Sequence, residues 1–380
     1  MSAKINPAES IRGLACLAVV FSHLAMSFFP YLHHFDPHET TDLKWVYHVH
    51  HSPFGFFYSG DAAVFVFFVL SGYVLSYAIL KSPQQFHSKI KNMMIKRYPR
   101  LMIPALASCL LIWSVFKIIH IDSQHVGAWL QAFAVQNYSF SHALYEGTIG
   151  AFLFSESDIN WVLWTMTIEL MGSFVLFFLL YLYQYKKIAF WFASLLIPCL
   201  AFIWRGQGFS FGISSFIIGI YIYLYAKTLP NLIAILMLFT GLYFAGAHNT
   251  STAYAGLYHI LGENTYDYGN FIAGILIVYS VLMSPLLSRH LDHPILVWLG
   301  KLSFSIYLLH LLMFYLVCIP LFNLFLTWHW AYSWAVLVSG LSAIAVTLIV
   351  ANFYSRYVDQ FAIDTSNRIA NKVLKPRNKP

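Results

Sequence analysis

Long apolar runs, separated by short polar connections, recur along the whole chain. A helix needs about 20 predominantly apolar residues to cross a bilayer. The pattern predicts ten membrane-spanning helices, near residues 11–29, 61–80, 101–119, 162–183, 188–204, 209–226, 232–247, 269–287, 296–319 and 333–354. We therefore expect an all-α fold, a polytopic bundle of about ten transmembrane helices.

Composition supports this class of fold. Of the 380 residues, 59% are hydrophobic and only 10% are charged. In soluble domains about a quarter of all residues are charged. With the N-terminus in the cytoplasm, most Lys and Arg residues of the short loops fall on the cytoplasmic side, as the positive-inside rule requires. The net charge of +7 is thereby explained by topology. We expect both termini in the cytoplasm and no nucleic-acid partner.

The chain shows no internal repeat and no low-complexity linker. We expect one transmembrane domain over residues 1–355, followed by a basic cytoplasmic tail over 356–380. The four cysteines lie in apolar spans, without the spacing of a redox motif or a metal site. We interpret them as packing residues.

The first span contains Arg12 and His23, two ionisable residues in a segment where such groups are costly and usually functional. On a helix they share one face, about 16 Å apart. A cation at the membrane surface and an imidazole at mid-depth suggest a route by which an anionic reactant reaches an acid or base. The alternative is an arginine marking the cytoplasmic end and a histidine bonded to a neighbouring helix.

The second span begins with Asp61 and has Ser71 and Gly72 near its middle. Gly72 lets a backbone or a thin substrate approach closely, and Ser71 can hydrogen-bond across helices. Packing is the more frequent use of small residues in a span. A carboxylate at a helix start suits the positive end of the dipole, and we favour this role for Asp61.

A basic segment precedes the third span and includes Lys96, Arg97 and Arg100. On a helix the two guanidinium groups, three residues apart, face one anion, as a phosphate clamp requires. A topology signal attracted to anionic lipid headgroups is the alternative.

Two further spans contain polar residues at depth. Glu169 lies about two turns inside the fourth span and needs a partner, for which a histidine or an arginine is the natural candidate. In the ninth span Tyr307 and His310 share a face with Ser303. Interhelical hydrogen bonding explains both sets equally well. Residues 33–51 are rich in histidine but lack standard zinc spacing, so we predict no metal site.

Taken together, these segments resemble the acyltransferase-3 family of integral membrane O-acyltransferases. The resemblance includes five motifs in the order of the family. The matching positions are Arg12 and His23; Gly60, Asp61, Phe67, Phe68, Ser71 and Gly72; Arg97, Arg100, Leu101 and Pro104; Trp164, Thr165 and Glu169; and Ser303, Ser305, Ile306, Tyr307, Leu308 and His310. The esterase-like domain that is often fused to such proteins does not follow the tenth span in this sequence.

The resemblance implies a multi-pass enzyme of the inner or plasma membrane. It would transfer an acyl group, commonly acetyl, from cytoplasmic acyl-CoA to a hydroxyl of a surface carbohydrate or of another extracytoplasmic or lipid-linked acceptor. Acyl-CoA is a co-substrate, and no permanently bound cofactor is expected.

The resemblance also implies roles for the candidate residues. We expect Lys96, Arg97 and Arg100 to bind the CoA phosphates, with Arg12 at the entrance and the pantetheine arm passing Gly72. His23 would be the general base, oriented by Glu169.

We expect Ser71, Tyr307 or His310 to donate hydrogen bonds to the oxyanion. An acyl-histidine intermediate is an alternative to direct transfer. The competing class of function is a transporter or flippase that uses the intramembrane Arg, His and Glu as a relay.

Overall fold

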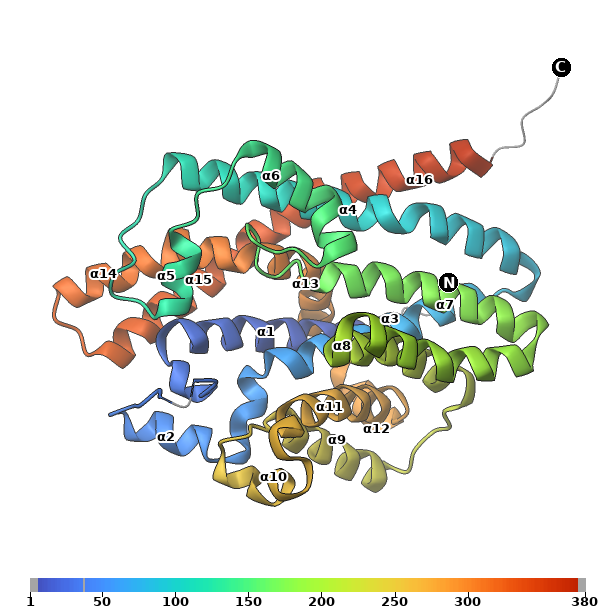
Figure 1. The fold of residues 1–380 in the computed structure, drawn as a ribbon, viewed down its shortest axis with the longest axis horizontal. Helices are drawn as coiled ribbons and strands as arrows, with labels where there is room; N and C mark the ends of the chain where they lie inside the picture. The colour runs from blue at the N-terminus through green and yellow to red at the C-terminus, as the bar shows by residue number, and fades with distance from the viewer. Residues whose placement is uncertain (1–5, 37, 375–380) are drawn as a thin grey trace. The chain divides into compact units, whose positions relative to one another are not determined.

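The computed structural model describes residues 6–36 and 38–374, and within these ranges the regular structure is entirely helical (Figure 1). Seven helices are long and apolar enough to cross a membrane, or eight if the bent pair Thr252–Leu282 and Pro285–Leu291 is one span. The predicted polytopic helical bundle is confirmed. Residues 375–380 of the expected basic tail lie outside the described residues.

The ten predicted spans coincide largely with helices, but four of them are not separate full-length spans, so the expected number of about ten becomes seven or eight among the described residues. The segment 269–287 crosses the 93° bend between Thr252–Leu282 and Pro285–Leu291. The segments 188–204 and 209–226 lie in one helix, α8 (Lys187–Tyr225), which is interrupted at Gly206 with φ 80°. The segment 232–247 corresponds to the short α9 (Asn231–Ala245). Apolar composition alone does not reveal how a run is divided or how long its helix becomes.

The chain divides into two compact units, which are described separately. The first unit comprises residues 6–70, 116–137 and 226–350 as far as they are described. Its helices are α1 (Asn6–Phe28), η1 (Pro30–Leu32), α2 (Lys44–His50), η2 (Pro53–Tyr58), the first half of α3 (Gly60–Leu80), α5 (Ala128–Ala134), α9, η5 (Thr252–Tyr254), α10 (Ala255–Leu261), η6 (Gly262–Asn264), α11 (Thr265–Leu282), α12 (Pro285–Leu291), α13 (Pro294–Met313), η7 (Phe314–Cys318), α14 (Ile319–Thr327) and most of α15 (Tyr332–Tyr354). Within it α9 packs side by side with α11 (Figure 1).

The second unit comprises residues 71–115, 138–225 and 351–374 as far as they are described. Its helices are the second half of α3, η3 (Pro83–Gln85), most of α4 (Phe86–Ile118), α6 (Phe140–Tyr145), η4 (Glu146–Phe154), α7 (Thr165–Tyr185), α8, η8 (Ser355–Asp359) and α16 (Gln360–Leu374). Helices α7 and α8 pack against each other (Figure 1). Arg356, the first residue of the expected tail, continues a helix.

In the first unit α1 and α13 run parallel and in register. The Cys16 thiol donates to the Ser303 carbonyl, and His23 hydrogen-bonds His310; both pairs are separated by 287 residues. Gly13 and Gly300 have the same separation and lie in contact. A constant separation means that both helices run in the same direction. Each histidine lies ten residues after the glycine of its helix, which is about 15 Å along the axis. The glycine contact therefore fixes which residues of the two helices meet further along.

The crossing of α1 and α13 leaves no room for side chains at either glycine. A Cβ on Gly300 would lie 1.9 Å from the Glu9 carbonyl oxygen, and one on Gly13 would lie 2.7 Å from the Gly300 nitrogen. Small residues allow this close backbone approach between helices in a membrane.

Gly72 has an equivalent packing role in the second unit. A Cβ on it would lie 2.2 Å from the Phe216 carbonyl oxygen and 3.0 Å from the Gly219 Cα, both on α8. The backbone of α8 thus occupies the space beside Gly72, where we had expected the pantetheine arm. Of the two interpretations of Gly72, the structure favours helix packing.

Replacement of Gly300 by alanine should destabilise the protein, because its methyl group would overlap a backbone carbonyl that cannot rotate away. We expect a loss of about 2 kcal/mol, typical of overpacking, measured as a lower unfolding midpoint of the detergent-purified protein. Gly256→Ala is the matched control, since no atom lies within 4 Å of its added methyl group. Equal midpoints for the two variants would contradict this account of the crossing.

Candidate active site

His23 and His310 form a hydrogen-bonded pair within the first unit. The Nδ1 atom of His23 lies 2.6 Å from the Nε2 atom of His310, and the two rings are coplanar within 6°. His310 is fully buried, and its Nδ1 lies 3.1 Å from the Ile306 carbonyl oxygen. The sequence pointed to both histidines but did not show that they pair.

The Ile306 carbonyl determines which nitrogen atoms carry hydrogen when both histidines are neutral. A carbonyl oxygen only accepts, so the His310 Nδ1 carries hydrogen and donates to Ile306. The Nε2 of His310 then accepts the hydrogen on His23 Nδ1. It follows that the lone pair of His23 is on Nε2, the atom that can take a proton from a substrate.

A third ring covers the face of His23. The indole of Trp129, on α5, lies 5.0 Å from the imidazole centroid and is inclined to it by 25°. Sequence reasoning missed Trp129, because α5 is a seven-residue helix in a connection without any motif.

In the second unit Glu169 is the centre of a polar group. Its carboxylate accepts hydrogen bonds from the Arg97 guanidinium, with which it forms an ion pair, and from the Ser71 hydroxyl at 2.9 Å. The Arg97 and Glu169 side chains are only 14% and 15% exposed. The sequence left a histidine or an arginine open as the partner of Glu169, and the structure has an arginine in that place. We had expected Glu169 to orient His23, but it is His310 that holds the His23 Nδ1.

The basic segment lies on α4, where Lys96 is half-buried and Arg100 is exposed. Arg97 points one nitrogen at Glu169, while its Nε is buried and has no hydrogen-bond partner. A buried guanidinium N–H without an acceptor is unfavourable. The Nε of Arg97 therefore still needs an acceptor.

The remaining predicted residues belong to the first unit. Arg12 forms an ion pair with Glu9 on the same helix, at 3.0 Å. Asp61 lies in the first turn of α3, as expected for a residue that complements the helix dipole, and its carboxylate accepts a hydrogen bond from Tyr266. Tyr307 is buried, and its ring lies 6.3 Å from that of His310.

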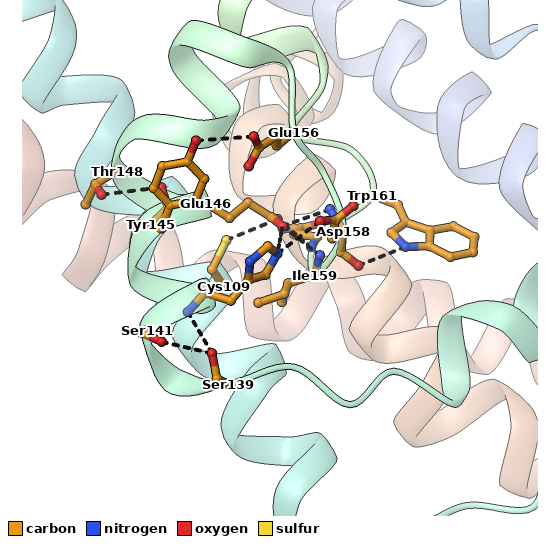
Figure 2. A network of polar contacts seen from close by, with 12 residues as sticks. Cys109, Ser139, Ser141, Tyr145, Glu146, Thr148, Glu156, Asp158, Ile159 and Trp161 are labelled. Carbon is orange, nitrogen blue, oxygen red and sulfur yellow. Dashed lines mark hydrogen bonds and ion pairs between the residues drawn. The ribbon is translucent and has the colours of Figure 1, made fainter.

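A second buried carboxylate, Glu146, anchors the loop that leads into α7 (Figure 2). It is 0% exposed and accepts the backbone N–H groups of Asp158, Ile159 and Asn160 at 2.8–2.9 Å. The Cys109 thiol of α4 also donates to it. Glu146 thus ties the loop before α7 to α4. An acid inside the apolar run of η4 was a signal of the same kind as Glu169, and sequence reasoning overlooked it.

One group of side chains has the composition of a metal site. His142, Glu146 and Asp158 bring one ligand atom each within 4.8 Å of the others. Both oxygens of Glu146 already accept backbone N–H groups, and the Nε2 of His142 donates to the Asp158 carboxylate at 3.0 Å. Hydrogen bonding therefore accounts for this group, and we assign it no ion.

The histidines of the 33–51 segment form a cluster with His248. The His33 ring lies 5.6 Å and the His50 ring 5.5 Å from the His248 ring, and His34 lies 5.5 Å from His50. Hydrogen bonds from this cluster join α2 to the turn after α9, through His50 and Thr250 at 3.1 Å. Burial, with smaller contributions from neighbouring imidazoles, lowers the pKa of both His33 and His50 to about 4.

Comparison with known families decides the class of the protein. A family model described as an acyltransferase domain matches residues 8–352 of the chain. The chain belongs to the acyltransferase-3 family. Among curated proteins and among solved structures, no match to the chain was found.

Membership accounts for the multi-pass architecture and makes the protein an acyltransferase. Two polar groups are the candidates for the active site of this acyltransferase. They are the His23–His310 pair and the Arg97–Glu169–Ser71 group.

Glu169→Gln should destabilise the second unit, because it leaves the Arg97 guanidinium largely buried without its counter-charge. Breaking a buried pair from one side costs about 3 kcal/mol, which a thermal-unfolding midpoint would register. The double variant Arg97→Gln/Glu169→Gln should recover part of this loss. A Glu169→Gln protein as stable as the wild type would show that the pair is not a stabilising contact.

Acid should weaken the histidine cluster. His33 is 3% exposed, and its pKa of about 4 lies below the usual 6.5 of the unfolded chain. Between these values the unfolded state binds the proton more readily, so stability contributed by neutral His33 is present above pH 6.5 and is lost as the pH falls towards 4. The loss amounts to about 3 kcal/mol.

Unfolding midpoints of wild type and His33→Gln at pH 7.5, 5.5 and 4.5 check this expectation. The variant should lose less stability on acidification than the wild type. His259→Gln, at an exposed position of α10, serves as the control. Identical pH dependence in all three proteins would refute the assignment.

Proposed function

We propose that the protein transfers an acyl group, acetyl in the favoured case, from cytoplasmic acyl-CoA to a hydroxyl group. The acceptor would be a surface carbohydrate or another extracytoplasmic or lipid-linked molecule, and the enzyme would reside in the inner or plasma membrane. Family membership supports acyl transfer in general. The observation that carries the mechanism is the orientation of His23 by His310.

His23 is suited to act as general base through Nε2. The chain of contacts from Ile306 through His310 keeps the hydrogen of neutral His23 on Nδ1. A histidine oriented by a second group is a recurrent arrangement in acyl transfer. Here an imidazole takes the orienting position.

The donor would be held through its phosphates by Lys96, Arg97 and Arg100. The unpartnered Nε of Arg97 supports this role, because a phosphate oxygen would satisfy it. Glu169, which also accepts a hydrogen bond from Ser71, binds an Nη atom on the other side of the guanidinium group and so restricts its orientation.

The acceptor oxygen forms a bond to the thioester carbon while its proton passes to His23 Nε2. The carbon–sulfur bond breaks, CoA leaves as thiolate and takes up the proton from His23. Attack by Nε2 itself, giving an acyl-histidine, uses the same lone pair. The Tyr307 hydroxyl is the proposed donor to the oxyanion, since the Ser71 hydroxyl already donates its hydrogen to Glu169.

His23→Ala should lower the turnover of acetyl-CoA about 100-fold or more, the contribution typical of a general base. Release of the CoA thiol by the detergent-solubilised full chain measures this rate, with water or methyl glycosides as trial acceptors. His259→Ala is the matched control and should retain the wild-type rate. Near-normal thiol release by His23→Ala would reject the role of His23, and transport of a solute without thioester cleavage would reject acyl transfer.

A further inference from the structure

Trp129 contacts the base without being part of any motif. Its half-buried indole stacks on the His23 imidazole, with centroids 5.0 Å apart. We propose that Trp129 is a positioning residue for the reaction, which holds the His23 ring and stabilises its protonated form. This inference rests on the proposed function.

The position of Trp129 is fixed by other residues of the first unit. Leu130 and Phe133 of the same helix are fully buried, and Phe133 packs on Phe116. The Gly127 N–H donates to the Ser27 carbonyl at 2.7 Å, at the end of α1. A Cβ on Gly127 would lie 2.7 Å from the same oxygen, so the two backbones meet closely.

This docking places α5 on the segment of α1 that carries His23. The Ser27 hydroxyl in turn donates to the His23 carbonyl at 2.6 Å. Leu130 and Phe133 already provide the apolar burial that holds α5 in place. The docking of α5 thus holds the indole against the imidazole of His23.

The charges around His23 indicate what the indole contributes. The titratable groups that interact with His23 are His310 on α13 and His33 after η1. Both are imidazoles, and either one, when protonated, repels a proton on His23. The face of an indole carries negative potential and attracts a cation held against it.

This attraction acts during the reaction and is small before it. His23 is neutral when the acceptor binds, and it becomes an imidazolium while Nε2 holds the acceptor proton. An interaction that is stronger in this state than in the ground state accelerates the chemical step. Trp129 also restricts rotation of the ring about its Cβ–Cγ bond, since one face is covered.

The test compares Trp129→Phe, which keeps a smaller aromatic face, with Trp129→Leu, which keeps only apolar bulk. Acetyl-CoA is the probe, water is the acceptor, and thiol release by the purified full chain is followed from pH 5 to 9. We expect the rate to fall about fivefold in Trp129→Leu, with the acid-side midpoint of the pH profile about half a pH unit lower. The rate and the midpoint of Trp129→Phe should lie between those of the wild type and those of Trp129→Leu. Trp330→Leu, which removes an indole stacked on Phe325, is the control and should behave as wild type.

A wild-type rate and profile in Trp129→Leu would overturn the proposal. So would a slower rate with an unmoved midpoint, because packing alone predicts that result.

A second readout does not need turnover. Imidazolium in contact with indole quenches its fluorescence, so the emission lost in Trp129→Phe relative to wild type should fall on acidification. His23→Gln should abolish that step. If wild type releases no more thiol than His23→Ala, the proposed function fails, and this fluorescence difference still decides whether Trp129 senses the charge of His23. A difference spectrum independent of pH would overturn the inference.

Discussion

The backbones of α1 and α13 lie in direct contact where Gly13 meets Gly300, and the placement of the histidine pair depends on that contact. Parallel helices in register bring together residues at a constant separation, so the glycine crossing and the His23–His310 hydrogen bond are two consequences of one alignment. A shift of one residue along either helix would rotate one imidazole by about 100° away from the other. Close packing at the crossing excludes such a shift.

The two buried carboxylates, Glu169 and Glu146, depend on hydrogen-bond donors within the protein. Water is scarce in the interior of a membrane protein, so each carboxylate needs donors from the chain. Glu169 obtains them from a guanidinium and a hydroxyl, whereas Glu146 obtains them from three consecutive backbone N–H groups and a thiol. The first arrangement leaves the Nε of Arg97 without an acceptor among the described residues. The second is complete in itself and stabilises a loop.

The sequence predicted the helical class, the positions of the apolar segments and the residues at which polarity enters them. The sequence alone identifies an ionisable residue within an apolar run, and Arg12, His23 and Glu169 were found in this way. It does not show which residues of different helices contact one another. Whether His23 meets a carboxylate or a second imidazole depends on helix register, and the contact of Trp129 depends on a backbone hydrogen bond at Gly127. The break at Gly206 is equally a matter of backbone conformation rather than of composition.

An imidazole in the orienting position has a physical advantage over a carboxylate at this depth. A carboxylate beside His23 would be a charge that must be kept solvated or paired throughout the catalytic cycle. A neutral His310 fixes the tautomer of His23 equally well, because its Nδ1 is held by the Ile306 carbonyl, which is a fixed part of α13. In the proposed mechanism, charge then appears at the pair only while His23 holds the acceptor proton. In the same proposed mechanism the neutral indole face of Trp129, which contacts the ring, stabilises that transient charge.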